Sequence, residues 1–346
     1  MVDLAVQLRS DSVAIAQAAT HRQFATDERL TTRLGPAAAD RCAEDAAFHL
    51  HQLASAVHTG RTELFADYIA WVTRLLLDLG LTADDLATQL SAINDELTSR
   101  FGDDAAAARE VLAAVQADPP EPIDATTSLL ATSGPGAHLA RTFLGRVLGG
   151  QRHEAITSIT DAVDDGMALE TVYLEVLQPC LREVGRLWQT GRISVAQEHL
   201  VTAATQVAMA QLYPRVFATP RIGRTAVVAS IGGELHEIGG RMVADLFELR
   251  GWTTVFAGAN TPTPALVSLV AEHEPDVIAL SATIGAHVPD VANTIARLRA
   301  SLTVPIIAGG RAFLEVPGLW RDVGADGTAA DAVVAVALAN DLVEAA

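Results

Sequence analysis

The spacing of apolar and polar positions changes at Thr225. Downstream of it, short apolar runs rich in β-branched residues alternate with amphipathic stretches of helical length. Continuous apolar strands separated by helices indicate a parallel sheet covered on both faces, so we expect a doubly wound, Rossmann-like α/β domain over residues 221–346. Ligands of such sheets bind at the carboxyl ends of the strands. The predicted strands cover Thr225–Ile231, 253–256, Val277–Ser281 and 304–308.

Upstream of the predicted sheet, apolar residues recur at three- and four-residue steps, the spacing of amphipathic helices. Residues 137–220 predict a four-helix bundle. Gly149-Gly150 separates the first two helices, Asp164-Asp165-Gly166 separates the next two, and Gly191 follows the third. The bundle is therefore expected directly before the α/β domain.

A proline-rich segment precedes the bundle, from Asp118-Pro119-Pro120 to Pro135-Gly136. Because proline cannot continue a helix, we predict a linker over residues 118–136. Residues 1–117 then form a separate N-terminal helical domain. Within it, Gly80 is expected to end one helix, and residues 82–85 have the form of a capping box that opens the next.

The charge and cysteine content narrow the possible environments and partners. The net charge of −18 repels phosphate backbones, so we expect no direct contact with nucleic acid. The two cysteines, Cys42 and Cys180, form neither a metal-ligand spacing nor a disulfide framework. The sequence has no recognisable secretory signal and no apolar run long enough to span a bilayer, so we expect a soluble cytoplasmic protein without membrane contact.

Three short motifs lie at predicted strand ends. Glu234-Leu235-His236-Glu237-Ile238-Gly239 follows the first strand, Ser281-Ala282-Thr283 ends the third, and Gly309-Gly310 ends the fourth. Together they resemble the cobalamin-binding motif of methionine synthase and its relatives, written DxHxxG, SxL or SxT, then GG. The resemblance implies that His236 displaces the dimethylbenzimidazole of the cofactor from the lower face of cobalt. It also implies that the displaced nucleotide tail enters the α/β domain.

The residue types suit that chemistry. A neutral imidazole offers cobalt a nitrogen lone pair, and its other nitrogen needs an oriented acceptor. Glu234 stands where the family has aspartate and supplies that acceptor on a side chain one methylene longer. Gly239, Gly309 and Gly310 would leave room for the corrin and its tail, while Ser281 and Thr283 offer hydroxyls. We expect Leu235, Glu237 and Ile238 to complete the cofactor-binding loop. The alternative is an ordinary glycine-rich loop before a helix, with His236 as a simple loop residue.

The predicted bundle carries a second pattern: Trp188, nine intervening residues, then Glu198-His199. It resembles a signature of cobalamin-dependent photoreceptor repressors. That resemblance implies adenosylcobalamin, with Trp188 packed on the adenosyl group and Glu198 and His199 hydrogen-bonded to it. The chain departs from that family by having no recognisable DNA-binding domain. It also carries Gln189 where those repressors have a histidine that captures cobalt after photolysis.

The N-terminal domain collects aromatic residues and histidines, and these give two readings. One is a helical core with exposed histidines. The other is a pocket for a flat conjugated ligand, because the layout of the whole chain resembles the photocobilins, which hold both cobalamin and biliverdin. Cys42 could form a thioether to a bilin, but an incidental cysteine is the simpler interpretation, so we expect non-covalent binding. The candidate pocket residues are His49, His51, His58, Phe65, Tyr68 and Trp71.

Three functions remain open at this stage. A light-sensing adenosylcobalamin protein without catalytic activity fits the Trp188 to Glu198-His199 spacing, and by resemblance it would be a homo-oligomer whose assembly depends on light. A corrinoid carrier that shuttles methyl groups shares the same layout, so the fold cannot separate the two. A mutase small subunit would require a barrel partner. The sequence does not identify a downstream protein partner.

Overall fold

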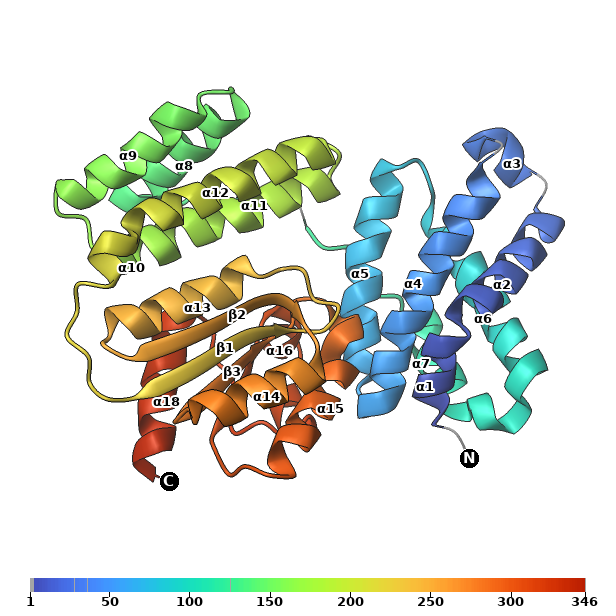
Figure 1. Ribbon diagram of the computed structural model, residues 1–346. Helices are drawn as coiled ribbons and strands as arrows, with labels where there is room; N and C mark the ends of the chain where they lie inside the picture. Colours follow the sequence, from blue (N-terminus) through green and yellow to red (C-terminus); the bar gives the residue numbers. More distant parts are fainter. Residues whose placement is uncertain (1–2, 28, 36, 125, 346) are drawn as a thin grey trace. The chain divides into compact units, whose positions relative to one another are not determined.

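The computed structural model describes residues 3–27, 29–35, 37–124 and 126–345. The chain divides into two compact units. The first comprises residues 1–123 together with Ile284–Pro289, and the second comprises Asp124–Thr283 and Asp290–Ala346. The expected fold class is confirmed: a helical N-terminal region is followed by a helical bundle and a parallel sheet flanked by helices (Figure 1).

The N-terminal unit is helical throughout its length. The first described helix begins at Leu4, and the second, Ser12–Thr26, is rich in alanine and only weakly amphipathic. The predicted capping box is confirmed: the Thr82 hydroxyl accepts from the Asp85 backbone N–H, and the Asp85 carboxylate accepts from the Thr82 N–H. The helices are α1 (Leu4–Ser10), α2 (Ser12–Thr26), α3 (Arg29–Leu34), α4 (Ala38–Thr59), α5 (Thr62–Asp78), α6 (Ala83–Phe101), the 3-10 helix η1 (Gly102–Ala105) and α7 (Ala106–Ala117).

The bundle has the four expected helices, and the third is compound. Its first helix begins at Pro135, two residues before the expected start, because proline at the first helical position lacks only an N–H that would be unbonded anyway. The segment Val172–Leu177 is π-helical, a feature that the apolar spacing did not predict. The elements are α8 (Pro135–Leu148), α9 (Arg152–Asp164), α10 (Leu169–Thr171), η2 (Val172–Leu177), α11 (Gln178–Gln189) and α12 (Val195–Val216).

The sheet has four parallel strands in the order β2-β1-β3-β4. Two strands match the predicted bounds, whereas β2 runs five residues further and β4 begins two residues later than expected. The strands and following helices are β1 (Thr225–Ile231), α13 (Ile238–Leu249), β2 (Thr253–Thr261), α14 (Thr263–His273), β3 (Val277–Ser281), η3 (Gly285–His287), α15 (Val288–Arg299), β4 (Ile306–Gly309), α16 (Arg311–Glu315), α17 (Leu319–Asp322) and α18 (Ala332–Ala345).

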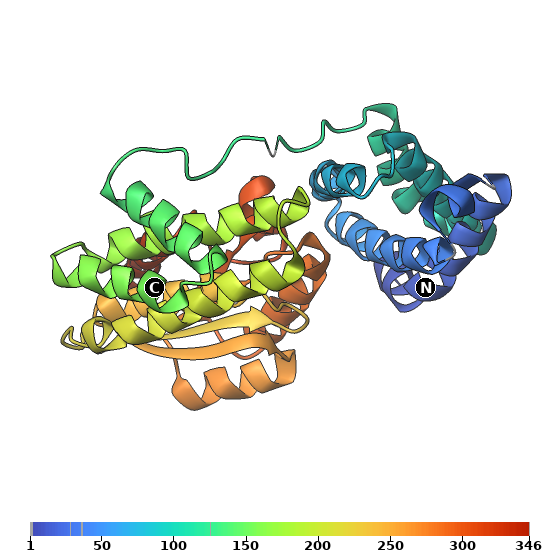
Figure 2. The ribbon, with the colours of Figure 1, turned by 90° about the horizontal axis from the view of Figure 1, so that it is seen from above.

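The bundle and the α/β domain share one hydrophobic core. Ala226 and Val228 of β1 belong to the same buried cluster as Phe143 of α8 and Leu212 of α12. Helix α13 lies between the bundle and the sheet, and the bundle helices run across the α/β domain when viewed from above (Figures 1 and 2). The loop that carries His236 leads directly into α13, so the sequence places the candidate ligand at the junction of the two layers.

Candidate cobalamin site

The sheet register brings the three motif pieces to one edge. Ser230 of β1 pairs with Ser281 of β3, and Ser281 pairs with Gly309 of β4. The carboxyl ends of adjacent parallel strands meet at the same edge of a sheet, so residues distant in sequence become neighbours. The loop from Gly232 to Glu237 leaves β1 at this edge.

Glu234 is the buried anchor of that loop, with no exposed surface. Its Oε1 accepts from the His236 backbone N–H at 2.9 Å and lies 2.6 Å from His236 Nδ1. Its Oε2 accepts from the Thr283 backbone N–H at 2.6 Å. The longer side chain, in place of the family aspartate, therefore still reaches the imidazole. It also ties the first motif piece to the second.

His236 is held on one side and open on the other. Its side chain is 59% exposed. The Glu234 hydrogen bond raises the pKa of the imidazole above its ordinary value, desolvation opposes that rise, and the charges of Glu234 and Glu198 add to it. In the neutral ring, Nδ1–H donates to the carboxylate, which leaves the lone pair on Nε2. No described residue is hydrogen-bonded to Nε2, which is the arrangement that a metal-ligating histidine requires.

The glycines of the motif differ in their surroundings. Within 4 Å of the position that a Cβ would take, neither Gly239 nor Gly309 meets any atom of the described residues. Gly310 has φ +105° and a Cβ there would lie 2.2 Å from the Ala282 carbonyl oxygen, so only glycine fits. Leu235 is 71% exposed, whereas Ile238 is buried. The site thus combines open glycines, an exposed apolar side chain and an imidazole that is hydrogen-bonded at Nδ1 only. These features fit a large, flat, partly apolar group such as a corrinoid.

Polar atoms at the strand ends add to this fit. Ser281 and Thr283 are half-buried, and in the described part of the chain their hydroxyls have no hydrogen-bond partner. Ser230 was not predicted as a site residue; its hydroxyl is fully buried and also without a partner among the described residues. A buried unsatisfied hydroxyl costs free energy, so a bound group or water that supplies a partner is favoured. No local signal in the sequence marks Ser230, and only the sheet register places it beside Ser281.

Asn260 is a second residue that the sequence analysis missed. Its backbone N–H donates to the Glu234 carbonyl at 2.9 Å, and its Oδ1 accepts from the Gly233 N–H at 2.7 Å. It has φ 51°, a conformation that asparagine tolerates better than most residues. We had predicted that the second strand ends at residue 256, and that prediction was wrong. The strand instead continues to Thr261 and brings Asn260 under the loop.

The second sequence pattern lies on the bundle helices α11 and α12. Trp188 at the end of α11 is half-buried, and Glu198 and His199 lie in the first turn of α12. Glu198 Oε2 lies 2.5 Å from His199 Nδ1, and Glu198 Oε1 accepts from the Thr202 hydroxyl at 2.8 Å. Further along α12, Gln206 Nε2 donates to Glu237 Oε1 at 3.2 Å, which joins this helix to the loop that carries His236. Gln189 is 5% exposed and lies among buried bundle residues.

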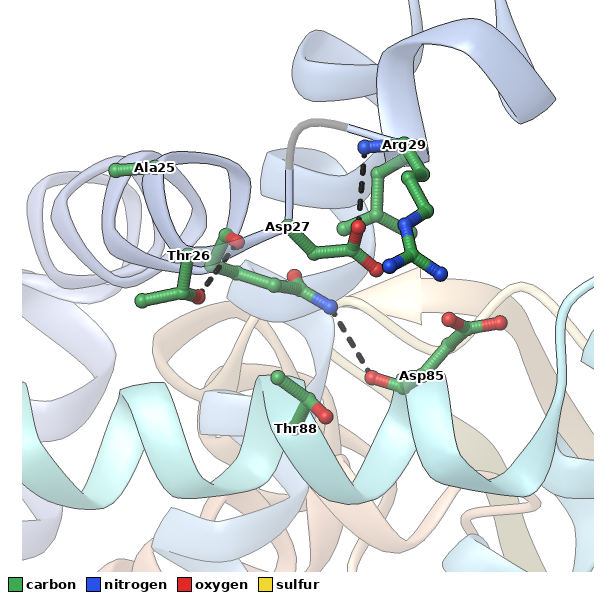
Figure 3. Close-up of a pocket in the computed structure, with 8 residues that line it drawn as sticks. Ala25, Thr26, Asp27, Arg29, Asp85 and Thr88 are labelled. Atoms are coloured by element: carbon green, nitrogen blue, oxygen red, sulfur yellow. Dashed lines mark hydrogen bonds between the residues drawn. The ribbon is translucent and has the colours of Figure 1, made fainter.

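The residues of the candidate bilin pocket divide into two groups. His49, Phe65 and Tyr68 are buried and contact one another in the core of the N-terminal unit. His51 and Trp71 are half-buried, and His58 is exposed. A pocket of about 730 Å³ in this unit lies elsewhere, between the end of α2 and the start of α6 (Figure 3). It is lined by Gln23, Ala25, Thr26, Asp27, Arg29, Leu30, Asp85 and Thr88.

Two broader features concern metals and membranes. The described residues contain no cluster of three or more histidine, cysteine, aspartate or glutamate side chains that could hold a metal ion. A single imidazole on a metal already enclosed by a corrin ring requires no such cluster.

Among the same residues, every helix is too short or too polar to cross a bilayer.

Comparison with known families and relatives supports the cofactor class. Residues 224–337 match a family model described as a B12 binding domain, and residues 139–213 match a second model with that description. The chain is 29% identical over 204 residues to the HTH-type transcriptional repressor CarA of Myxococcus xanthus, which covers 58% of this chain and 64% of the repressor. It is 32% identical over 163 residues to the HTH-type transcriptional repressor CarH of the same organism, covering 44% and 52%. The chain thus spans between half and two thirds of these repressors.

Corrinoid proteins are also among the relatives. Dimethylamine corrinoid protein 1 of Methanosarcina acetivorans is 28% identical over 171 residues, covering 47% of this chain and 78% of that protein. The structure of the Methanosarcina barkeri monomethylamine corrinoid protein superposes with a TM-score of 0.53 at 20% identity, covering 59% of this chain and 98% of that one. At that identity the likeness concerns the fold alone.

These relatives alter one expectation. Two of them are named as HTH-type transcriptional repressors, so the absence of direct nucleic-acid contact that we expected from the net charge is not supported. The matches to two B12 binding domains, one over the bundle and one over the sheet, agree with the site geometry. The second unit of the chain therefore contains a cobalamin-binding module, built from a helical cap and a Rossmann-like domain.

Proposed function

We propose that this chain is a light-sensing regulatory protein that binds adenosylcobalamin, with His236 as the lower ligand of cobalt and no catalytic activity of its own. One observation carries the proposal. Among the described residues His236 Nε2 has no hydrogen-bond partner, Gly239 and Gly309 are open, and Glu237, next to His236, is hydrogen-bonded to Gln206 of the cap helix α12. This arrangement supports a lower ligand from the His236 loop and an upper face covered by the bundle.

Each residue has a defined task in this proposal. Glu234 fixes the tautomer of His236 and keeps its ring oriented. Gly239 and Gly309 leave space, Gly310 allows its loop to approach Ala282 closely, and Ser281 and Thr283 offer hydroxyls to the nucleotide tail. Trp188, Glu198 and His199 cover the upper face and exclude water from it. Adenosylcobalamin would supply a cobalt–carbon bond that can be broken, and visible light would be the trigger.

Glutamine at position 189 defines the upper side further. Gln189 is buried in the bundle, and its amide is a poor replacement for imidazole as a cobalt ligand. We therefore propose that this position does not capture cobalt after illumination. Loss of the adenosyl contacts would instead change the packing of the cap, which is a two-state switch biased by a ligand. A light-dependent change in homo-oligomeric state and an unidentified protein partner belong to the same proposal.

We further propose biliverdin as a second chromophore in the N-terminal unit. The support is the aromatic content of α4 and α5, where Phe48 is 41% exposed and Trp71 is half-buried. The burial of His49, Phe65 and Tyr68 favours the competing interpretation, a packed core. Protein prepared with biliverdin should show a red absorption band, and its absence would restrict the chain to cobalamin.

A methyl-carrying corrinoid protein is the second candidate function. The relation to dimethylamine corrinoid protein 1 favours it, since that match covers most of that protein. A carrier has to admit a methyl group and a methyltransferase to the upper face of the cofactor. It needs no polar side chains there to bind an adenosyl group. The Trp188 to Glu198-His199 pattern favours the light sensor.

Absorption spectra separate the two functions. The full chain is loaded with adenosylcobalamin or methylcobalamin in the dark and then illuminated with green light. Retention of adenosylcobalamin, with a spectral change on illumination and a shift in elution volume, supports the photoreceptor. Binding of methylcobalamin but not adenosylcobalamin would overturn it in favour of the carrier.

A further inference from the structure

Glu237 follows the candidate cobalt ligand directly, yet both of its carboxylate oxygens are engaged within the protein. Oε1 accepts from Gln206 Nε2 of α12 at 3.2 Å. Oε2 accepts from the Ala259 backbone N–H, near the end of β2, at 3.1 Å. One side chain therefore connects the His236 loop, the cap helix and the strand beside β1.

Two more contacts continue this connection along α13. Arg241 Nε donates to the Tyr213 hydroxyl at 2.7 Å, and the Tyr173 hydroxyl donates to Asp245 Oδ2 at 2.7 Å. Residues 237, 241 and 245 are four apart, so they lie on one face of the helix. We call these three residues and their partners Gln206, Tyr213 and Tyr173 the polar seam. It joins the cap to the helix that begins at the His236 loop.

The position of Gln206 explains why the seam matters for the upper face. Glu198, Thr202 and Gln206 are spaced four residues apart on α12, so they also share one helical face. Gln206 is held by Glu237, and Glu198 lies two turns from Gln206 toward the N-terminus of the same helix. A rigid helix held at Gln206 therefore has the position of its Glu198 end fixed relative to the His236 loop.

We propose that Glu237 is a positioning residue rather than a cofactor ligand, and that its bond to Gln206 sets the height of the cap above His236. This inference rests on the proposed adenosylcobalamin function. It adds to that function the prediction that two glutamates have separate roles. Glu234 orients the lower ligand, His236, and Glu237 sets the position of the cap over the upper face of the cofactor. Only a cofactor with a large upper group should then depend on Glu237.

The variants Glu237→Ala and Gln206→Ala test this division in the full chain. We expect the dark dissociation rate of adenosylcobalamin to rise about 5- to 10-fold in each, equivalent to the loss of one hydrogen bond. Methylcobalamin dissociation should change less than about twofold, and the spectrum of histidine-ligated cobalt should remain. The double variant should be no worse than the more affected single variant, since both remove one contact.

Gln211→Ala is the matched control, because Gln211 is an exposed glutamine on the same helix and outside the seam. Equal effects on both cobalamins, additive effects of the two substitutions, or a lost histidine-ligated spectrum in Glu237→Ala would overturn the positioning role. Unchanged dissociation in both single variants would overturn it as well.

A second readout keeps the inference separate from the proposed function. If the wild-type chain binds no adenosylcobalamin, the photoreceptor proposal fails, but the seam can still be measured by hydrogen–deuterium exchange in the cofactor-free chain. Faster exchange in α12 for Glu237→Ala and Gln206→Ala, but not for Gln211→Ala, would support the seam as the contact that positions the cap. Unchanged exchange in α12 would overturn it.

Discussion

Two histidines of this chain, His49 and His236, each have a hydrogen-bond partner 2.6 Å from Nδ1, but they differ in burial and in what their Nε2 atoms contact. His49 Nδ1 lies 2.6 Å from the Tyr68 hydroxyl, and His236 Nδ1 lies 2.6 Å from a Glu234 carboxylate oxygen. His49 is 1% exposed and its Nε2 is occupied by Gln89 Oε1 at 3.0 Å. The His236 side chain is 59% exposed and has no described partner at Nε2.

Their surroundings push the two pKa values in opposite directions. Burial lowers the pKa of His49 to about 4, and the hydrogen bond to Gln89 opposes this only weakly. The Glu234 carboxylate raises the pKa of His236. A histidine with both nitrogens satisfied in a core is a structural element, whereas one with an anionic partner and an open nitrogen is suited to binding a metal.

The largest expected effect comes from removing the open imidazole. His236→Ala should abolish the spectrum of histidine-ligated cobalt and weaken cobalamin binding by about 100-fold or more, since it removes a ligand that outer partners alone tune by 10- to 100-fold. Titration of the variant with adenosylcobalamin, followed by absorption, measures both. His49→Gln is the comparison, and it should leave the spectrum unchanged. A histidine-ligated spectrum in His236→Ala would assign the lower ligand to another residue.

The next effect concerns the stability of the N-terminal unit at acid pH. An imidazole whose pKa is about 4 when folded and about 6.5 when unfolded takes up its proton more readily in the unfolded chain. Its stabilising contribution is therefore complete above pH 6.5 and is lost as the pH falls toward 4. Between pH 7.5 and pH 5 the loss should be about 2 kcal/mol.

Urea unfolding followed by circular dichroism, at both pH values, tests this expectation. His49→Gln removes the titrating group, so its free energy of unfolding should fall less between pH 7.5 and pH 5 than that of the wild-type chain. An identical fall in both proteins would show that His49 does not carry the acid sensitivity.

A smaller effect is expected from the carboxylate behind the ligand. Glu234→Gln keeps the size of the side chain but introduces an amide N–H₂ into a site where Glu234 accepts from the backbone N–H groups of His236 and Thr283. We expect roughly a tenfold loss of cobalamin affinity, the effect of disturbing a ligand's hydrogen-bond partner. Glu272→Gln, at an exposed position of α14, serves as control. If Glu234→Gln bound cobalamin as tightly as the wild-type chain, Glu234 would have no role in orienting His236.

An effect of similar size, confined to stability, should come from the partner of the buried histidine. Tyr68→Phe removes the hydroxyl that donates to His49 Nδ1 and leaves a buried acceptor without a donor. The free energy of unfolding should fall by about 1–2 kcal/mol, while cobalamin binding stays unchanged. A change in the cobalamin spectrum of this variant would contradict the separation of the two histidine sites.

Much of the fold could be predicted from the sequence because its signals are local. The apolar runs of β1 and β3, the glycine breaks of the bundle and the Thr82–Asp85 capping box all lie within a few residues of the structure that they specify. The extension of β2 to Thr261 could not be predicted. Its exposed and half-buried residues interrupt the apolar pattern, and it is the pairing with β1 that extends it.

The candidate site shows the same division. His236, Glu234 and the motif glycines could be identified because short spacings and a family resemblance carry them. Ser230 and Asn260 were missed, since a serine inside a strand and an asparagine after an apparent strand end have no distinguishing local signal. The sequence analysis placed His49 and His236 in candidate ligand sites alike, because residue type and neighbours in the chain do not report burial.

Periodicity and short spacings were enough to predict the α/β class, the bundle before it and the motif residues at the strand ends. Which histidine is open and which is enclosed depends on the packing of distant segments. The same packing gives both carboxylate oxygens of Glu237 their hydrogen bonds within the protein and holds α12 at Gln206. The physical reason is that solvation and hydrogen-bond partners are set by segments far apart in the chain. A pKa or a free lone pair exists only once those segments have packed.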